Sequence, residues 1–430
     1  MDEEVALILR NSESQTETQN HTRDIHILSS AFLLIFLAYG AAQNLESTVN
    51  TGQDLGTISL GILYTSFAAS SLFASLVVKG LGSKNALVLG TTGYWLFIAA
   101  NLKPTWLTMV PASLYLGFTA SVIWVAQGTY LTSSARFHAN DCKLEEPNVI
   151  GSLNGEFWGV FATHQILGNL LSLALLNDGV EGETSNTTLL FLVFLCSMTI
   201  GTVLMCFLSK KGSRGEIVIP DSSDNFYSFL ISKSKSLFTP LFDKRMLLLI
   251  PLIAYSGLQQ AFVWAEFTKF IVKPTLGESG VGGAMAVYGA FNSLCSLFVG
   301  RLTSGLQSIT WIVAAGASLQ SIALITVLFP FSVTSGVMYP LIVAAILGIG
   351  DGVFNTQLNA LLAMLFKHDM EGAFSHFKLW QSGAIAVVFF LSPYISMQTM
   401  VVIMLVSICI SMFGFFILVL KVEAAFSTVA

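Results

Sequence analysis

The sequence predicts an all-helical polytopic membrane protein that crosses the bilayer twelve times as two six-helix bundles. Its 430 residues are 54% hydrophobic and only 10% charged, whereas a soluble domain carries roughly 25% charged residues. The mean hydropathy of +0.73 agrees with this. Long apolar runs can satisfy their backbone hydrogen bonds in lipid only as helices, so these runs are expected to span the bilayer.

Runs of about 20 apolar residues mark the expected spans. Six lie in the first half of the chain: Ile27–Glu46, Ile58–Val78, Ala86–Ala100, Trp106–Leu131, Phe157–Leu176 and Leu189–Leu208. Six more follow a long polar stretch: Met246–Phe270, Ala284–Val299, Ile309–Leu328, Tyr339–Phe366, Phe377–Ile395 and Met400–Leu420. The chain is therefore predicted to consist of an N-terminal tail (1–26), a first bundle (27–209), a linker (210–245), a second bundle (246–420) and a C-terminal tail (421–430).

The basic residues orient the chain, because cytoplasmic loops hold the excess of Lys and Arg. With the N-terminus inside, only Lys103, Lys269 and Lys273 of the 20 basic residues fall on the outer side. Both termini are therefore expected to be cytoplasmic, in a plasma membrane or in an endosomal or vacuolar membrane. The Asn-x-Thr sequon at Asn186 would then face outward, where it can be glycosylated.

Composition and motifs exclude several functional classes. With 20 basic against 25 acidic residues, the chain lacks the basic surface that nucleic-acid binding needs. The five cysteines are scattered without metal-ligand spacing, so neither a metal nor another cofactor is expected. Catalysis is not expected either, because the sequence has no nucleophile-elbow, zinc-protease or phosphate-loop motif.

The two halves share local patterns in the same chain order, as parallel repeats would. Ala38–Asn44 in the first span corresponds to Ala254–Gln260 in the seventh. Trp158 and Trp380 lie at corresponding places in the fifth and eleventh spans. Two repeated halves of six helices are the layout of the major facilitator superfamily.

Further motifs resemble the unc-93-like (uncoordinated-93) family, a branch with the major facilitator fold. They are Gln43–Ser47, Leu55–Thr57, Leu81–Lys84, Trp124–Thr132 and Ala373–Gln381. The resemblance covers nearly the whole chain from Ile25 onward, and the short tails and loops are most similar to those of plant members. Family members are associated with regulating potassium channels or escorting membrane proteins. The resemblance therefore implies that this protein, besides lying in the lipid bilayer, has a protein partner, which would be an ion channel or another membrane protein.

One loop departs from ordinary facilitators, in which an acid between the second and third spans helps gate the exchange between two states. Here Val78–Asn85 places Lys79 where that acid would be. The missing acid weakens the inference from fold to transport, and the resemblance implies a regulatory or accessory role in ion (potassium) transport and potassium homeostasis or in membrane-protein trafficking. The alternative is a secondary transporter of a small solute or cation, whose two halves rock about a central site.

Polar side chains at bilayer depth are candidate sites, because burying them there is costly. Asp351, Asn355 and Asn359 recur every four residues on one helical stripe, where they could ligate a cation or a polar solute. The alternative is that Asp351 bonds or pairs with a neighbouring helix, with which Gly348 and Gly352 would allow close packing.

The first and seventh spans line the central cavity in this fold. Gln43 and Asn44 are therefore expected to face Gln259 and Gln260 across it, and hydrogen bonding between helices is their alternative role. Three further residues are cavity candidates. Gln127 offers an amide, Trp124 a ring that could stack on a solute, and His164 an imidazole that could relay protons. For each of them, packing between helices is the alternative role.

Three charged groups complete the predictions. Glu156 and Lys378 lie at corresponding inner ends of the fifth and eleventh spans, which suggests an ion pair closing the cytoplasmic side, with loop solvation as the alternative. Glu266 and Lys269 are three residues apart and are expected to pair on the helix surface. The N-terminal tail carries a pattern that resembles an acidic dileucine sorting signal: Glu3, Leu7 and Ile8.

Overall fold

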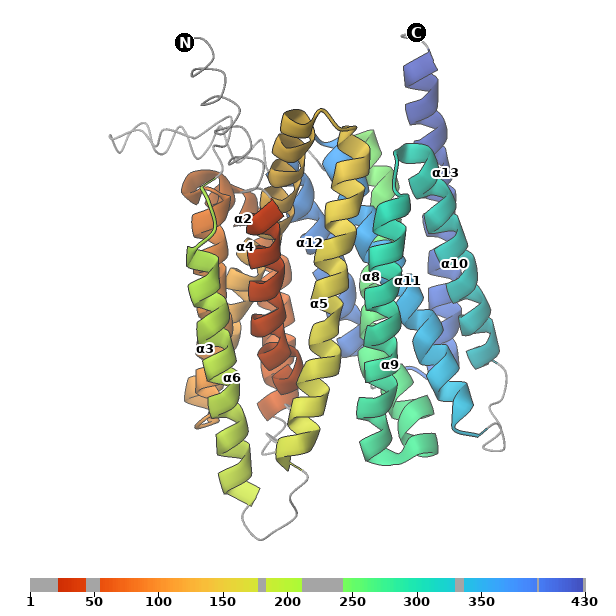
Figure 1. Cartoon of the computed structure of the whole chain (residues 1–430). Coiled ribbons are helices and arrows are strands. Elements are labelled where there is room, and N and C mark those ends of the chain that lie inside the picture. The colour runs from red at the N-terminus through yellow and green to blue at the C-terminus, as the bar shows by residue number, and fades with distance from the viewer. Residues whose placement is uncertain are drawn as a thin grey trace, which may run out of the picture.

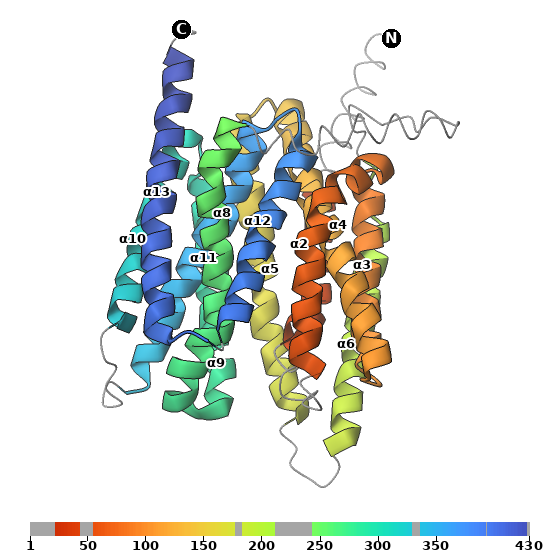
Figure 2. The ribbon, with the colours of Figure 1, turned by 180° about the vertical axis from the view of Figure 1, so that it is seen from behind.

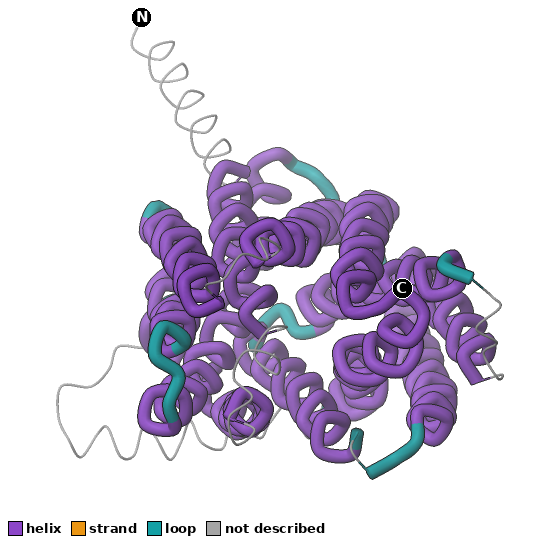
Figure 3. Tube along the Cα trace, turned by 90° about the horizontal axis from the view of Figure 1, so that it is seen from below, coloured by secondary structure: helices purple, strands orange, loops and turns teal. Residues whose placement is uncertain are grey.

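The computed structural model is helical in nearly all of the chain that it describes (Figures 1 and 3), namely residues 22–43, 55–176, 183–210, 243–328, 336–392 and 394–427. The first half contains the N-terminal helix Thr22–Gln43, α2 (Leu55–Leu81), α3 (Ser83–Ala100), α4 (Trp106–Cys142), α5 (Glu146–Leu176) and α6 (Glu183–Cys206). The second half contains α8 (Lys244–Phe262), the π-helix η2 (Val263–Val272), α9 (Lys273–Leu302), α10 (Leu306–Leu328), α11 (Met338–Leu365), α12 (Met370–Leu391) and α13 (Met397–Ser427).

These helices confirm the all-helical, multi-pass prediction, and within the described residues ten helical stretches are long and apolar enough to cross a membrane. Three helices begin well before their predicted spans: α5 at Glu146 rather than Phe157, α9 at Lys273 rather than Ala284, and α12 at Met370 rather than Phe377. The first turns of α5 and α12 pack against other helices instead of lipid. Because such turns carry polar and small residues, a search for apolar runs does not include them.

The two halves meet along α5 and α9 and along α2 and α12 (Figures 1 and 2). The N-terminal helix begins and α13 ends at the same end of the bundle (Figure 1), which we call the termini side. The opposite end is the far side. There the N-terminal helix ends and α2 begins.

Glycines bring α5 and α9 into close contact. A Cβ atom on Gly155 would lie 2.6 Å from the Cα of Gly300, and one on Gly300 would lie 2.4 Å from the Cα of Gly155. Beside them, Ser293 Oγ donates a 2.5 Å hydrogen bond to the carbonyl of Gly159. Both Gly155 and Gly300 are therefore required by the approach of the two backbones.

Ion pairs join the two halves on the termini side. Nζ of Lys79, near the end of α2, lies 2.5 Å from Oδ1 of Asp369, which caps the N-terminus of α12. Glu146 at the start of α5 accepts hydrogen bonds from Lys367 Nζ at 3.0 Å and from Arg136 Nε at 3.2 Å. Arg136 also donates to a backbone carbonyl of α11 at 2.6 Å. We call this group the termini-side latch: Lys79, Arg136, Glu146, Lys367 and Asp369.

The structure contradicts the predicted pairing of Glu156 with Lys378. Glu156 lies 2.8 Å from Nδ1 of His26, which belongs to the same half, and no ion pair joins it to Lys378 in the described part of the chain. Lys378 lies inside the bundle, because α12 begins at Met370, about 12 Å earlier along the helix axis.

The close contact of Gly155 with Gly300 predicts that a glycine-to-alanine substitution destabilises the protein there but not at an open position. Gly155→Ala places a Cβ against the α9 backbone, so the free energy of unfolding should fall by about 1–3 kcal/mol. Gly383→Ala on α12 adds the same atom where nothing lies within 4 Å and should not destabilise the protein. Thermal unfolding of the purified variants measures this, and equal melting temperatures would contradict the close contact.

The latch predicts a pH-dependent stability. Burial raises the pKa of the Glu146 carboxyl, but the hydrogen bond and charge of Lys367 and the charge of Arg136 outweigh burial, so this pKa lies below its ordinary value of 4.5. An acid with a lowered pKa stabilises the fold above its unfolded pKa, and this contribution disappears as the pH falls through the folded pKa. The melting temperature of wild-type protein should therefore exceed that of Glu146→Gln near neutral pH. The difference should shrink as the pH falls below 4.5 and vanish once the pH is below the folded pKa.

The same melting series with Glu145→Gln is the control. Glu145 is the neighbouring acid, and its carboxylate accepts from Asn148 rather than from a latch cation. A difference between wild-type protein and Glu146→Gln that stays constant into acid would contradict the role of the Glu146 carboxylate.

Candidate functional site

A cavity of about 120 Å³ lies between the two halves. Its walls come from the N-terminal helix and α2 to α5 on one side, and from α8, η2, α9, α11 and α12 on the other. Toward the far side it adjoins a vestibule of about 1190 Å³. The residues that line both spaces are Gly40, Gln43, His164, Gln165 and Trp264. We call the smaller space the central cavity.

Asp351 lines the central cavity inside a cage of amide groups. Its Oδ1 accepts hydrogen bonds from Gln260 Nε2 at 3.0 Å and from Asn355 Nδ2 at 2.9 Å, and its Oδ2 accepts one from Asn292 Nδ2 at 2.6 Å. The three amides come from α8, α11 and α9. Donors of this kind stabilise a buried carboxylate without a cationic partner. Both alternatives for Asp351 are thus compatible with its place, because it bonds to neighbouring helices and also faces a cavity.

Lys378 lines the same cavity from α12 and is 4% exposed. Its Nζ donates a 2.8 Å hydrogen bond to Gln381 Oε1. The ammonium also lies 4.6 Å from the centre of a Trp124 ring, which is cation–π geometry. Among the described residues, Lys378 and Asp351 form no direct ion pair. An acid and a base therefore share one cavity while remaining apart.

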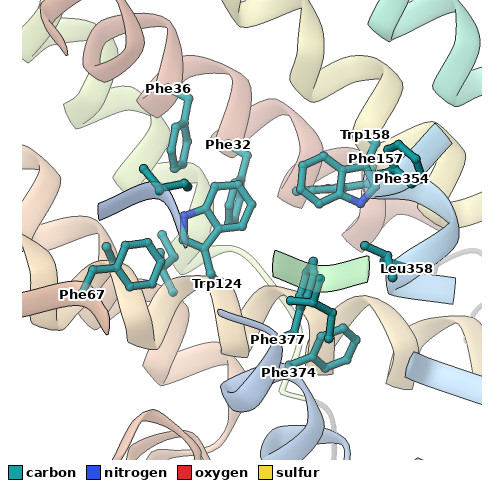
Figure 4. Close-up of a cluster of buried hydrophobic side chains, with 14 of the residues drawn as sticks. Phe32, Phe36, Phe67, Trp124, Phe157, Trp158, Phe354, Leu358, Phe374 and Phe377 are labelled. Atoms are coloured by element: carbon teal, nitrogen blue, oxygen red, sulfur yellow. The ribbon is translucent and has the colours of Figure 1, made fainter. Parts of the chain in front are cut away.

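Aromatic rings form the wall of the cavity on the first half. The rings of Trp124 and Trp158 stack with centroids 5.8 Å apart, and Phe36 and Phe161 pack against Trp124 at 5.1 and 5.4 Å. Figure 4 shows Trp124 and Trp158 together with rings of the N-terminal helix, α5, α11 and α12. The four rings Phe36, Trp124, Trp158 and Phe161, which we call the aromatic wall, are apolar except for the two indole N–H groups.

Two predicted residues lie where the central cavity meets the vestibule. Nδ1 of His164 is 2.6 Å from the carbonyl oxygen of Phe161 and must donate to it, which leaves Nε2 as an acceptor in the neutral ring. Gln43 Nε2 donates to the hydroxyl of Tyr64 at 2.8 Å. Gln43 and Gln260 line the central cavity from opposite halves.

Three other candidates lie away from both cavities. Gln259 Nε2 donates to a carbonyl of α11 at 3.1 Å, and Asn359 Nδ2 donates to the Asn355 carbonyl one turn earlier at 2.7 Å. Gln127 is 1% exposed, and neither atom of its amide has a hydrogen-bond partner among the described residues. For Gln259 and Asn359 the geometry matches the packing alternative.

The remaining predicted residues are not placed in a site. Asn44 and the residues of the predicted sorting signal, Glu3, Leu7 and Ile8, lie outside the described residues. Asn186 lies in the first turn of α6, and its glycosylation stays a prediction.

Glu266 does not pair with Lys269, contrary to the prediction. The hydroxyl of Ser392 on α12 donates to the buried carboxylate of Glu266, whereas Lys269 lies beside the Phe270 ring at 5.0 Å. Both residues are in η2, whose backbone hydrogen bonds run from i to i+5, so side chains three residues apart do not share a face.

Sequence reasoning missed Asn292 and Trp158 as cavity residues and misplaced Lys378. Asn292 is a polar residue within the predicted span Ala284–Val299, so the rule that identified Asp351 could have found it. Predicting that Lys378 lies inside the bundle requires knowing that α12 begins at Met370, and hydropathy alone does not show where this helix begins.

The architecture and the cavity can now be compared with known proteins. The structure matches a fucose:proton symporter of Escherichia coli over 93% of this chain and 99% of that one, with a TM-score of 0.65. It matches the human organic anion transporter MFSD10 over 92% and 99%, with a TM-score of 0.68. Sequence identity is 12% in both, so these likenesses show the major facilitator fold alone.

Similarity in sequence identifies the family as well as the fold. The family model described as "Ion channel regulatory protein UNC-93" matches residues 48–416. UNC93-like protein 3 of Arabidopsis thaliana is 64% identical over 94% of this chain and 88% of its own length. The "Putative potassium channel regulatory protein unc-93" of Caenorhabditis elegans is 29% identical over 91% of this chain and 60% of its own length. This chain therefore belongs to the UNC-93 family, on the major facilitator fold.

Proposed function

We propose that this protein binds a small solute in its central cavity and exposes that cavity to the two sides of the membrane in turn. The observation that carries the proposal is the pair of buried ionisable side chains, Asp351 and Lys378, that face one cavity between the two halves. Buried charges in membrane proteins are rare and mark functional sites. In facilitators the site lies at the interface of the repeated halves, as this cavity does.

The termini-side latch supports the same function. The missing acid at Lys79 argued against transport at the level of sequence. In the fold, Asp369 of the other half supplies a carboxylate to Lys79 across the interface. A charge pair between the halves can open and close when they rock, which a pair within one half would not do.

The orientation is part of the proposal. With the basic loops and both termini in the cytoplasm, the vestibule opens away from the cytoplasm and the latch closes the cytoplasmic side. The membrane would be the plasma membrane or an endosomal or vacuolar one, and the proposal includes no catalytic step.

A second candidate function is regulation of an ion channel or another membrane protein. It is supported by the family description and by the name of the Caenorhabditis elegans relative. The two functions are compatible, because a partner that binds one of two states shifts the population toward that state. Binding of a solute in the cavity would then change the affinity of the protein for its partner.

Alternating access predicts opposite changes at the two sides when the latch is weakened. Reporter cysteines replace Thr65 in the vestibule and Ser375 in the closed interface, in a background whose five native cysteines are serine. Lys79→Gln should slow maleimide labelling at position 65 and speed it at position 375. A partly exposed ion pair contributes up to about 1 kcal/mol, so each rate should change by up to about fivefold.

Exchanging the charges with Lys79→Asp and Asp369→Lys should restore both rates. Lys84→Gln removes a charge nearby that belongs to no ion pair in the described part of the chain, and it should change neither rate. Faster labelling at both positions would indicate local loosening, and unchanged labelling would indicate one static state. Either result contradicts alternating access.

A further inference from the structure

Two hydrogen-bond donors at the central cavity are not fully satisfied by the described residues, and one acceptor, Gln165 Oε1, also has no partner there. Lys378 Nζ can donate three hydrogen bonds and donates one, to Gln381. Nε1 of Trp158 has no hydrogen-bond partner in the described structure, although the side chain is 4% exposed and lines the cavity. Buried donors are normally satisfied, so these two groups indicate a missing acceptor.

The two donor side chains are neighbours in the wall of the central cavity. Lys378 Nζ is 5.9 Å from the centre of a Trp158 ring. A carboxylate has two acceptor oxygens and can therefore bond to the ammonium and to the indole N–H together. Its negative charge would also give Lys378 a direct ionic partner, whereas Asp351 acts on the ammonium only from a distance within the same cavity.

The Asp351 carboxylate is a poor site for a potassium ion. Alkali and alkaline-earth cations bind to oxygen ligands, but both oxygens of Asp351 already accept N–H groups from Gln260, Asn292 and Asn355. These amides turn their donor atoms, not their oxygens, toward the carboxylate. A cation entering the cavity would also meet the ammonium of Lys378. The charge that remains without a direct partner is therefore positive.

We propose that the central cavity binds a small organic anion, with its carboxylate between Lys378 Nζ and Trp158 Nε1 and its apolar body against the aromatic wall. The proposal names the solute class of the proposed function and so depends on it. Trp124, Phe36 and Phe161 supply apolar ring surface beside the two donors. The vestibule gives the anion a route from the far side.

The test is calorimetric titration of the full-length protein in lipid nanodiscs with benzoate, benzamide and rubidium chloride. Benzoate carries a carboxylate on an apolar ring, and benzamide has the same ring without the charge. We expect benzoate to bind, and benzamide and rubidium not to compete with it. Lys378→Gln should weaken benzoate binding about tenfold or more, because it removes a hydrogen bond between two charged groups.

Two further variants keep the test independent of one substitution. Trp158→Phe keeps a ring but removes the N–H group, and it should weaken benzoate binding by a few-fold. Lys378→Arg keeps the positive charge and should bind benzoate more tightly than Lys378→Gln does. Lys103→Gln removes an equal charge from an exposed loop outside both cavities and should bind like wild type.

Four results would overturn the anion site. They are no benzoate binding by folded wild-type protein, equal binding of benzamide, competition by rubidium, and benzoate binding that Lys378→Gln leaves unchanged. The labelling experiment separates these failures from failure of the proposed function. If the reporters at positions 65 and 375 still respond oppositely while benzoate does not bind, alternation stands and the solute class is wrong.

Discussion

The burial of the Asp351 carboxylate is the constraint on which the rest of the structure depends. A charge at this depth is tolerated only if donors surround it, and leaving it without them would cost several kcal/mol. The donors are amides from three helices, α8, α9 and α11, so the cage holds these helices in one arrangement. That arrangement leaves a cavity on the side that faces the first half, where Lys378 enters from α12.

Two kinds of contact then join the halves. Between α5 and α9, Gly155 and Gly300 bring the backbones together without side chains, so this contact is short-range and apolar. On the termini side the contacts are ion pairs of partly exposed side chains, such as Lys79 with Asp369. Packed glycines can act as a pivot, whereas exposed ion pairs exchange readily with water. The cavity lies between these contacts and the vestibule, so its access can change while each bundle remains intact.

Much of this fold could be predicted from the sequence, because lipid requires its spanning segments to be long apolar helices. The resemblance carried by motifs such as Trp124–Thr132 also gave the family correctly. The site was predicted less well. Asp351, Gln43, Gln260, Trp124 and His164 do line the cavity, whereas Gln259 and Asn359 make packing hydrogen bonds, because neighbouring polar residues on a helix face different directions. Lys378 was misplaced because hydropathy does not reveal helical turns that are buried against protein, and the acid that pairs with Lys79 comes from a distant loop.

The most direct test of the account is the distance between the two halves at both ends of the bundle, measured by double electron–electron resonance. Spin labels at the exposed positions Leu144 and Leu302 report the termini side, and labels at Leu107 and Tyr394 report the far side. The account predicts two distance populations at each end, with Lys79→Gln lengthening the first pair and shortening the second. A single unchanged distance at both ends, in wild-type protein and in Lys79→Gln, would contradict alternation between two states.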